Sequence, residues 1–581
     1  MAAVLVLLCI LFSVLTIEEK SPEGAQGGKS LAKDIIQLVE KDSSNFPKEL
    51  QIFIAAGEGK TGDLFASSIE KELITAGLNI KGIAVGNPPK VRKAIQSAGK
   101  IDLIATTASL KSLPVFDSFL GEKKYPLPSN STDINDTLIK GEDLKSRFYH
   151  IWKTDISLES ICVVLPRNTE QVSNIMKICY ENDQEVVIHG GLTNLVGATK
   201  SNSSQVVISL EKMNKIIEID TDSKTITCES GVILEDLINA CKENDLLLPL
   251  NFGARGSAQI GGAVSTNAGG LRVFKYGMTR NLVLGTEAVL PNGKVISSLK
   301  KLIKDNSGYD LKQIFIGSEG TLGIVTKVIL RLYELPSSRL TALSALNTYD
   351  NVIKLLKHLE KNLSGNLSGF ELLWNSTYKT MVSEKTNYNK YLPDTYKYYV
   401  FIESTGSDYE SDYIKLENII TESLEKGYIE DAVIGKNDKE QTNIWGIRED
   451  VSVLADERKY DQHFDISIPT SSIGNIIDKI TNELLKNKDV KTIFPFGHVA
   501  DGNIHFIIGK DSDKDSITKE VNEIIYSNIE SVNGSISAEH GIGIDKKEYL
   551  KNTRNKDEIE LMKLLKKSID PKNILNPGRI L

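Results

Sequence analysis

The chain has 581 residues, which at roughly 150 residues per domain predicts about four domains. Hydrophobic residues make up 40% and charged residues 25%, close to globular averages, so disordered, collagen-like and multi-span membrane classes are disfavoured. The 69 basic and 77 acidic residues leave a net charge of −8, so we expect no nucleic acid partner. Five scattered cysteines without a C-x-x-C pair exclude a disulfide framework and an iron–sulfur cluster held by this chain.

Residues 2–17 form an uncharged apolar run, slightly short of the roughly 20 residues that cross a bilayer. The run lacks the basic start and the A-x-A site of a secretory signal, and Glu18 and Glu19 follow it rather than an arginine-rich stretch. Three interpretations stay open: an uncleaved membrane anchor, a divergent signal, and a buried helix or misplaced gene start. We therefore expect a cytoplasmic protein, or one associated with a membrane through residues 1–17.

Residues 31–115 alternate helix and strand patterns, which predicts a small α/β module with a parallel sheet. Its first strand, QIFIAAG, runs into the loop GEGKTG, but a phosphate-binding loop needs a glycine at position 54, which is Ile54. The module faintly resembles the IIB domains of sugar phosphotransferase systems, which carry a phosphorylated cysteine where this chain has Ala56. We interpret it as an accessory module, on fold-level analogy alone.

Residues 116–145 are rich in Pro, Asn, Ser and Asp without apolar periodicity, which predicts a linker. From about 155 to 335, short apolar strands are separated by glycine clusters. From 336 to 535, strands alternate with amphipathic helices, as in NVIKLLKHLEK and IGNIIDKITNELL. Helices that gather on one face of a largely antiparallel sheet make an α+β fold, which we expect here.

Three glycine-rich segments stand out: VVIHGGLTNLVG at 186–197, GARGSAQIGGAVSTNAGG at 253–270 and IGSEGTLGIVT at 316–326. The first is a strand that runs into a loop able to point several backbone N–H groups at one anion. The second has six glycines in eighteen positions. So many residues without a Cβ atom indicate that a flat ligand and its diphosphate lie directly on the main chain.

These segments, with the tail DPKNILNP, resemble the FAD-linked D-2-hydroxy acid dehydrogenases of the vanillyl-alcohol oxidase superfamily. The resemblance runs from about Ile161 to Leu581 and includes D-lactate, D-2-hydroxyglutarate and glycolate-oxidising enzymes. It implies a two-part FAD-binding domain over 146–335, a ferredoxin-like antiparallel substrate domain over 336–569, and a tail over 570–581 that returns to the flavin.

The resemblance also implies which residues hold FAD. The expected contacts are Gly190, Gly191, Leu192, Thr193, Asn194 and Gly197 at the pyrophosphate, Gly253, Gly256, Ser257, Gly261, Gly262, Thr266, Asn267 and Gly269 along the ribityl and isoalloxazine, Glu319, Gly320, Gly323 and Ile324 toward the adenine, and Asn576 near the flavin. His189 stands where relatives often have Pro or Gln, and we expect non-covalent FAD.

Two histidines flank an Asp501-Gly502 dipeptide in FGHVADGNIH, and Asp-Gly is a strong signal for a two-residue hairpin turn. Counting outward from that turn pairs His498 with His505, so the two imidazoles would share a face and suit one divalent cation. For an isolated pair of this kind, packing or hydrogen bonding across a hairpin is the more common arrangement. The segment SAEHG adds a carboxylate, Glu539, and a further imidazole, His540.

The family resemblance assigns the same residues as a site. It implies that His498, His505 and Glu539 bind a divalent metal, either zinc or manganese, and that His540 is the base. In the segment WGIRE, Arg448 matches the arginine that binds the substrate carboxylate, and Ser452 lies one helical turn further on, where relatives often carry Thr. An arginine fork fits a carboxylate bidentately.

The reaction that follows is oxidation of a D-2-hydroxy acid to the 2-oxo acid, with the 2-hydroxyl polarised by the metal, its proton taken by His540 and hydride passed to the flavin. The electron acceptor stays open among a quinone, an electron-transfer flavoprotein and a partner subunit. Two other functions stay open: a sensory or regulatory protein that keeps flavin without turnover, and an oxidase acting on polyols.

Two positions bear on which hydroxy acid is used. The segments NAGGLR and KDNSGYDLKQ most resemble D-2-hydroxyglutarate dehydrogenases, which carry lysine where this chain has His463 and asparagine where it has Ile507. Losing a permanent cation and an amide would leave a second carboxylate unpaired, at a cost of several kcal/mol. We therefore favour D-lactate or a similar monocarboxylate over the alternative, D-2-hydroxyglutarate.

Overall fold

The computed structural model describes residues 24–41, 50–98, 101, 103–107, 138–151, 156–455 and 458–581. The apolar run at 1–17 and residues 116–137 of the expected linker lie outside the described residues. The chain forms two compact units. Unit 1 comprises Met1–Arg167, Gln184–Thr193 and Thr199–Lys212, and unit 2 comprises Asn168–Asp183, Asn194–Ala198 and Met213–Leu581. In the part of the chain that the structure describes, no helix is long and apolar enough to cross a membrane.

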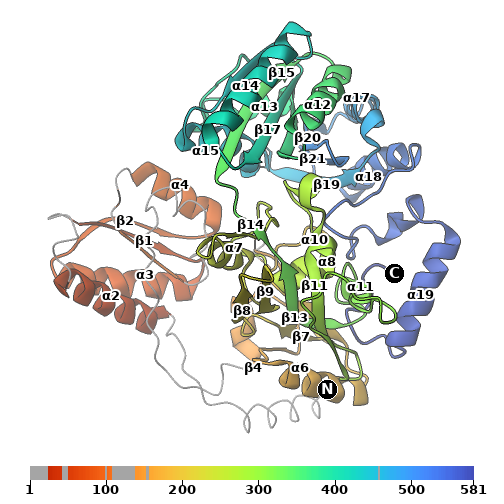
Figure 1. Ribbon diagram of the computed structural model, residues 1–581. Coiled ribbons are helices and arrows are strands. Elements are labelled where there is room, and N and C mark those ends of the chain that lie inside the picture. Colours follow the sequence, from red (N-terminus) through yellow and green to blue (C-terminus); the bar gives the residue numbers. More distant parts are fainter. Residues whose placement is uncertain are drawn as a thin grey trace. The chain divides into compact units, whose positions relative to one another are not determined.

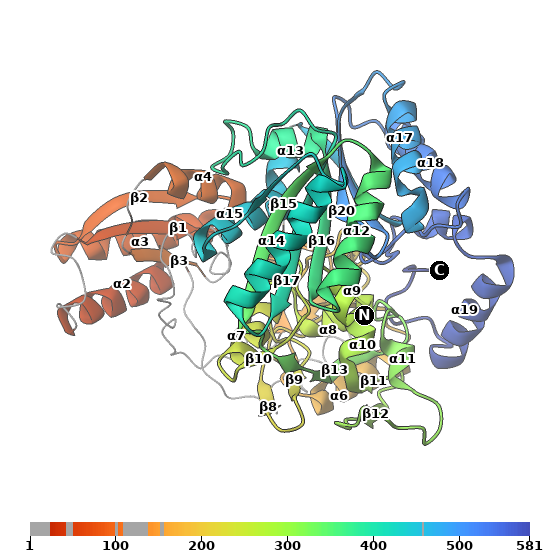
Figure 2. The same cartoon turned by 45° about the horizontal axis from the view of Figure 1, so that its top comes forward.

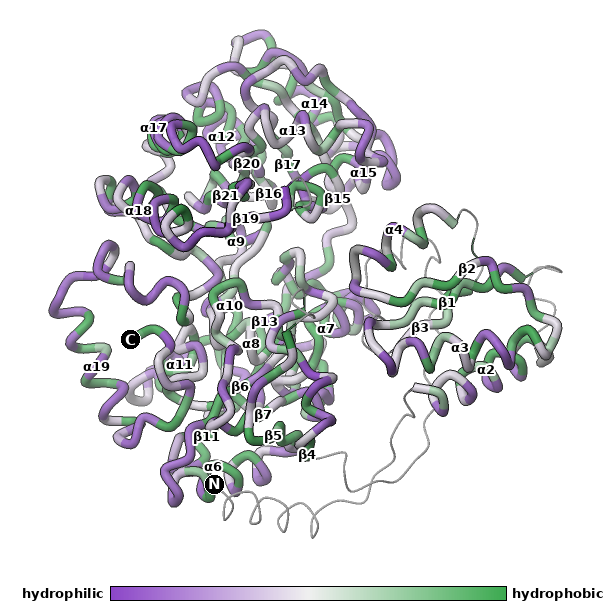
Figure 3. The backbone as a smooth tube through the Cα atoms, turned by 180° about the vertical axis from the view of Figure 1, so that it is seen from behind, coloured by the Kyte–Doolittle hydropathy of each residue, from purple (hydrophilic) through white to green (hydrophobic). Residues whose placement is uncertain are grey.

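The N-terminal module in unit 1 alternates helices and strands as its pattern predicts. Its elements are α2 (Gly24–Lys41), β1 (Gln51–Ala56), α3 (Lys60–Thr75), β2 (Asn79–Val85), α4 (Pro88–Ala98) and β3 (Leu103–Thr106). The strands pair in parallel in the order β2-β1-β3. Figure 1 shows α2 and α3 on one face of this sheet and α4 on the other. After Gln51, strand β1 is apolar (Figure 3), because helices cover both of its faces.

A second sheet of unit 1 has the order β4-β5-β7-β6. Its elements, with one 3₁₀ turn, are β4 (Leu138–Ile139), η2 (Gly141–Ser146), β5 (Cys162–Val164), β6 (Val186–His189) and β7 (Val206–Ser209). Strands β5, β7 and β6 are parallel, and β4 is antiparallel to β5. Residues 138–139 of the expected linker 116–145 thus form a paired strand, and a 3₁₀ turn follows them, so the regular structure begins before residue 146.

The first part of unit 2 contains a five-stranded sheet with the order β12-β11-β13-β9-β8 and a two-stranded β10-β14 pair. Its elements are α6 (Thr169–Glu181), β8 (Ile216–Asp220), β9 (Thr225–Glu229), α7 (Leu234–Lys242), β10 (Leu246–Leu247), α8 (Ile260–Thr266), α9 (Val273–Tyr276), α10 (Thr279–Leu282), β11 (Val283–Val289), β12 (Val295–Ser298), α11 (Lys312–Phe315), β13 (Ile324–Arg331) and β14 (Tyr333–Glu334). The predicted short strands and glycine-rich connections are present.

The second part of unit 2 is a seven-stranded antiparallel sheet with the order β18-β15-β17-β16-β20-β21-β19. Its strands are β15 (Ser338–Leu346), β16 (Leu367–Trp374), β17 (Tyr398–Gly406), β18 (Asp431–Ile434), β19 (Tyr460–Ser467), β20 (Val490–His498) and β21 (Asn503–Lys510). The helices and 3₁₀ turns are α12 (Tyr349–Leu363), α13 (Asn375–Met381), α14 (Tyr409–Glu425), α15 (Asp438–Glu449), α16 (Ser452–Ala455), η3 (Thr470–Ser472), α17 (Ile473–Leu484), α18 (Asp515–Glu530), η4 (Lys547–Asn552) and α19 (Lys556–Ile569).

Helices cover both faces of this sheet. Helices α12, α14, α17 and α18 pack on one face, and Figure 2 shows α12 and α14 lying along strands β16 and β17. Helices α13, α15 and α16 pack on the other face around Trp445 and Phe496. The expectation that helices gather on one face is therefore wrong, because the second face of the sheet also buries apolar side chains against helices. The α+β class is confirmed.

A buried ion cluster ties the start of α9 to the sheet. Glu403 on β17 is 3% exposed, and it accepts hydrogen bonds from Arg272 Nε at 3.1 Å and Ser368 Oγ at 2.7 Å, while Arg339 Nε lies 2.7 Å away. Burial alone would raise the pKa of Glu403, but the two arginines lower it to about 2. Since this pKa is depressed, the carboxylate stabilises the fold above its unfolded pKa, near 4.3, and the contribution is lost as the pH falls toward 2.

We predict that Glu403→Gln lowers the free energy of unfolding at pH 7 by about 2–4 kcal/mol, because Arg272 stays buried without its counter-charge. Denaturant unfolding at pH 7 and at pH 3.5 measures the effect. The deficit should be smaller at pH 3.5, since the unfolded wild-type chain then binds a proton at this carboxylate while the folded protein does not, so part of the contribution of Glu403 is already lost. Equal stability of the two proteins at pH 7 would contradict this account.

Candidate active site

The two histidines lie on the hairpin of β20 and β21, but its register differs from the predicted one. The strands pair His498 with Asn503 and Phe496 with His505, so the connection is the four-residue loop 499–502 and not a two-residue turn. The predicted direct pairing of His498 with His505 is therefore wrong, by two residues. Both side chains still share a face because side chains alternate with a period of two, and their ring centroids are 5.4 Å apart.

His498, His505 and Glu539 each offer a ligand atom, and the three atoms lie within 4.8 Å of one another. His498 Nε2 is 4.0 Å from Glu539 Oε1. Burial raises the pKa of Glu539 to about 7. Two imidazole nitrogens and a carboxylate oxygen are donors that zinc and manganese both accept, so the residues fit the expected metal.

Glu371, which the sequence analysis did not single out, connects two residues of the expected site. It lies on β16 and is fully buried. Its Oε1 is 2.6 Å from His498 Nδ1, and its Oε2 accepts a hydrogen bond from Arg448 Nε at 2.8 Å. Burial alone would raise the pKa of Glu371, but His498 and Arg448 outweigh burial and hold the pKa below its usual value. Burial likewise opposes the charged form of His498, yet Glu371 raises the pKa of His498 to about 9.

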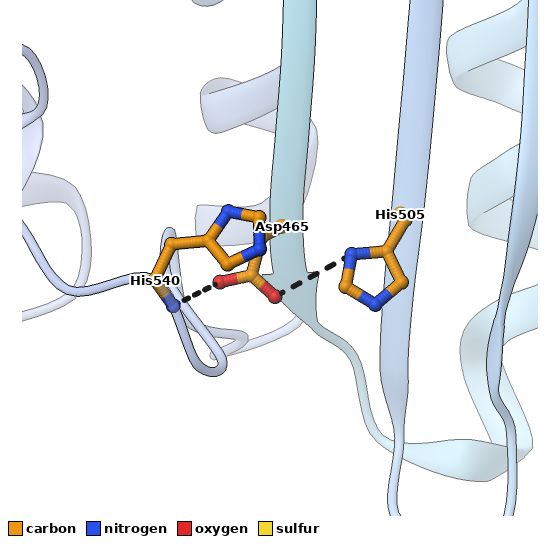
Figure 4. A group of neighbouring side chains, drawn as sticks. All are labelled: Asp465, His505 and His540. Carbon is orange, nitrogen blue, oxygen red and sulfur yellow. Dashed lines mark hydrogen bonds and ion pairs between the residues drawn. The ribbon is translucent and has the colours of Figure 1, made fainter. Parts of the chain in front are cut away.

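Asp465 on β19 holds the segment that carries Glu539 and His540. Its Oδ2 accepts hydrogen bonds at 2.8–3.0 Å from the backbone N–H groups of Ala538, Glu539 and His540. Its Oδ1 is buried without a hydrogen-bond partner among the described residues, and it lies 3.8 Å from His505 Nδ1 (Figure 4). Despite burial, His540, Lys546 and His505 hold the pKa of Asp465 well below its usual range.

His540 lies next to the three expected metal ligands, His498, His505 and Glu539. Its ring is stacked 5.7 Å from that of His505, and Asp465, His505 and His540 form a second group whose ligand atoms lie within 4.8 Å of one another. Burial lowers the pKa of His540, and Lys546 and His463 lower it further against the opposing effect of Asp465. A neutral imidazole is the form that can accept a proton.

Arg448 lies on α15 and is 6% exposed. Its Cζ is 4.9 Å from the centre of the Phe496 ring. Its Nε is bonded to Glu371, and none of the described residues accepts a hydrogen bond from its two Nη atoms. These two nitrogens are therefore free to bind a carboxylate.

Ser452 does not lie one helical turn beyond Arg448, as the sequence predicted. Helix α15 ends at Glu449, and Ser452 begins the separate short helix α16. Its hydroxyl donates to Asp450 Oδ1 at 2.7 Å. The helix breaks because Asp450 adopts φ −85° and ψ 57°, outside the helical region.

The second glycine segment forms a turn, helix α8 and a second turn that begins at Asn267, which has a left-handed φ of 52°. A Cβ atom added to Gly253 or Gly262 would meet nothing within 4 Å, so both border open space. A Cβ on Gly261 would approach Ser230, and one on Gly269 would meet Glu539 Oε1. The open backbone fits the flat ligand that the sequence predicts. The other predicted contacts here, in the turns or on α8, are Gly256, Ser257 and Thr266.

The other predicted flavin contacts lie on three segments. Gly190, Gly191, Leu192 and Thr193 follow β6 in unit 1, where His189 Nε2 lies 2.9 Å from the Thr199 carbonyl. In unit 2, Asn194 Oδ1 accepts from Ala198 N, and Gly197 has φ 67°. Glu319, Gly320, Gly323 and Ile324 lead into β13, and both Glu319 carboxylate oxygens accept backbone N–H groups of the 542–543 turn. Asn576 Nδ2 donates to the Glu319 carbonyl.

Beside the metal-ligand group, His463 on β19 pairs directly with Ile507 on β21, and Asp465 pairs with His505. Ile507 is 2% exposed and packs in the cluster with Trp445 and Phe496. His463 Nε2 is 2.5 Å from Asp461 Oδ2. His463 and Ile507, the two residues that bear on the choice of hydroxy acid, thus lie on the face that carries the candidate site.

Comparisons with known protein families identify two domains of the chain. Residues 160–298 match the family described as "FAD binding domain", and residues 335–580 match "FAD linked oxidases, C-terminal domain". A D-2-hydroxyglutarate dehydrogenase of Arabidopsis thaliana, named as mitochondrial, is 36% identical over 81% of this chain and 81% of its own length. A Schizosaccharomyces pombe protein that carries the name of a mitochondrial D-lactate dehydrogenase is 36% identical over 81% of this chain and 90% of its own length.

Solved structures share the fold at low identity. p-Cresol methylhydroxylase superposes with a TM-score of 0.60 at 17% identity, covering 77% of this chain and 94% of its own. An alkyldihydroxyacetonephosphate synthase gives a TM-score of 0.58 at 17% identity, covering 76% of this chain and 82% of its own. With the matched FAD-binding and C-terminal domains and with relatives above 30% identity over most of their length, the chain belongs to the FAD-linked D-2-hydroxy acid dehydrogenases.

Proposed function

We propose that this protein oxidises a D-2-hydroxy acid to the 2-oxo acid, with FAD bound non-covalently and a divalent cation bound by His498, His505 and Glu539. The observation that carries the proposal is the convergence of these three ligand atoms within 4.8 Å, next to His540 and joined to Arg448 through Glu371. A site for a 2-hydroxy acid needs an anchor for the carboxylate, a group that polarises the hydroxyl and a base.

The residues divide these tasks. Bound FAD supplies a two-electron acceptor, and a bound divalent cation supplies a Lewis acid for the hydroxyl. The two Nη atoms of Arg448 bind the substrate carboxylate as a fork. His540, whose pKa burial lowers, takes the hydroxyl proton at neutral pH. Asp465 keeps the backbone of His540 in place through its N–H group.

The surroundings of His463 favour a short or apolar side chain on the substrate. The imidazole of His463 is engaged by Asp461, and an acidic group at this position repels a second carboxylate. The opposed Ile507 offers hydrocarbon and no hydrogen-bond donor. We therefore propose D-lactate or a similar monocarboxylate as the substrate. The second candidate is D-2-hydroxyglutarate, which is favoured by the names of relatives such as the Arabidopsis enzyme.

The electron acceptor and the location are further proposals. A quinone, an electron-transfer flavoprotein or a partner subunit would each re-oxidise the flavin. We propose that the protein is cytoplasmic or associated with a membrane through residues 1–17, whereas several relatives are named as mitochondrial. Cell fractionation of the full chain and of a chain lacking residues 1–17 distinguishes these locations.

We predict that Gly262→Val abolishes FAD binding, because the new side chain would fill the open space beside α8. Gly262→Ala should weaken binding less. Acid denaturation of the yellow wild-type protein should release all of the flavin, which absorption of the supernatant measures. Flavin that stays with the polypeptide would contradict non-covalent binding, and wild-type FAD content in Gly262→Val would contradict the assigned place.

We predict that His505→Ala loses the divalent metal and turnover while keeping FAD, as elemental analysis and flavin absorption would show. His540→Ala is the matched control from the same cluster. It should keep the metal and the flavin but lose turnover by about 10²- to 10⁴-fold, as expected when a general base is removed. Normal turnover by metal-free wild-type protein would refute the role of the metal.

We predict a higher kcat/KM for D-lactate and D-2-hydroxybutyrate than for D-2-hydroxyglutarate with an artificial electron acceptor, and no activity on L-lactate. The double variant His463→Lys, Ile507→Asn should shift the preference toward D-2-hydroxyglutarate, because it restores a cation and an amide for the second carboxylate. A hundredfold preference of the wild-type protein for the dicarboxylate would overturn the substrate assignment and leave the flavin and metal assignments intact.

A further inference from the structure

Glu371 is the only charged residue of strand β16, whose eight residues are all buried. A carboxylate placed there is costly unless each oxygen has a partner. Both oxygens have one, and the partners come from different elements: His498 at the end of β20 and Arg448 on α15. One buried carboxylate therefore joins two residues that the proposed function places in direct contact with different groups.

The contact with His498 fixes which nitrogen faces the cation. An ionised carboxylate can only accept hydrogen bonds, so His498 Nδ1 donates to Glu371 Oε1. The opposite nitrogen, Nε2, points toward Glu539 at 4.0 Å. A carboxylate behind a ligating imidazole sets the ring's orientation and tautomer and raises its basicity as a ligand.

The contact with Arg448 fixes the orientation of its guanidinium group. Glu371 Oε2 accepts a hydrogen bond from Arg448 Nε, and the guanidinium lies over the Phe496 ring. These two contacts give the planar guanidinium one orientation. Only the end of the fork, with its two Nη atoms, is left for a ligand. The arginine thus presents a defined bidentate surface to a carboxylate.

We propose that Glu371 is a positioning residue that sets the distance between the carboxylate anchor, Arg448, and the cation ligand, His498. This inference rests on the proposed function, because a 2-hydroxy acid carries its carboxylate and its hydroxyl on adjacent carbon atoms. Both groups engage together only if anchor and cation are held at one spacing, and misplacement by about 1 Å is costly to catalysis. Glu371 then supports cation binding and substrate binding through two separate contacts.

If Glu371 only stabilised the fold, its substitution would change stability and neither affinity. Glu403 provides the matched control for this case. Glu403 is also a buried glutamate of the same sheet that neutralises arginine side chains, but it contacts none of the proposed metal ligands or Arg448. Glu403→Gln should therefore reduce stability and leave both affinities unchanged. A residue that merely stabilises the fold would behave in the same way at position 371.

The test compares Glu371→Gln with the wild-type holoprotein. FAD content and thermal unfolding report on the fold, and competition with a chelator gives the affinities for Zn²⁺ and Mn²⁺. Propionate, a carboxylate without a hydroxyl, probes Arg448 through its perturbation of the flavin spectrum. Glu371→Gln should keep FAD, bind the cation about 10- to 100-fold more weakly and bind propionate at least tenfold more weakly.

A double-mutant cycle separates the two contacts. Arg448→Lys removes the Nε group, so adding Glu371→Gln should weaken propionate binding much less than in the wild-type background, while the loss of cation affinity persists. If Glu371→Gln fails to fold, Glu371→Asp serves, because its shorter side chain keeps the charge but cannot reach both partners. That variant should lose at least one of the two affinities.

Three outcomes overturn the inference: wild-type affinities in Glu371→Gln, wild-type affinities in Glu371→Asp, or strict additivity with Arg448→Lys. Failure of the proposed function looks different, because the wild-type protein itself would then bind no divalent cation or turn over no 2-hydroxy acid.

Discussion

The site depends on the Asp465 carboxylate, which holds three consecutive backbone N–H groups of the segment that carries Glu539 and His540. Residues 538–540 lie more than seventy positions away in the chain, and these hydrogen bonds bring them against β19. The same carboxylate faces His505 with its other oxygen. A single buried acid thereby assembles a proposed metal ligand and the proposed base beside the hairpin histidines.

Buried acids recur around this arrangement. Glu319 binds the 542–543 turn, Glu371 binds His498 and Arg448, and Glu403 binds Arg272. Each charge is removed from water at a cost that good hydrogen-bond geometry must offset, and a packed apolar core of the same shape would often be as stable. Of these acids, Glu371 gives His498 and Arg448 a fixed direction, whereas Glu319 and Glu403 hold a backbone turn and arginine side chains in place.

The candidate site lies on one face of the seven-stranded sheet. Helices α12, α14, α17 and α18 pack on one face, whereas α13, α15 and α16 pack on the opposite face around Trp445 and Phe496. The side chains of the site project from this second face, with Asp465 opposite His505 and His463 opposite Ile507. Helix α15 packs on the same face and carries Arg448, whose Nε donates a hydrogen bond to Glu371. The paired strands β19 and β21 thus carry both a proposed metal ligand, His505, and the two residues proposed to face the substrate's side chain.

The sequence alone determined the alternation of strands and helices and the glycine segments, and it made His498, His505, Glu539 and His540 candidates for one site, whereas Arg448 was predicted from the family resemblance. The shared face of the two histidines depends on local spacing, and it survived a register error of two residues because side chains alternate with that period. Only the tertiary structure decided the contacts of Glu371 and Asp465, whose side-chain hydrogen-bond partners lie 72 to 127 positions away along the chain. It also separated Ser452 from the helix of Arg448. A single acidic residue in an apolar strand indicates that its carboxylate has a buried partner. The neighbouring residues in the sequence do not identify that partner, because packing between distant elements brings it into contact.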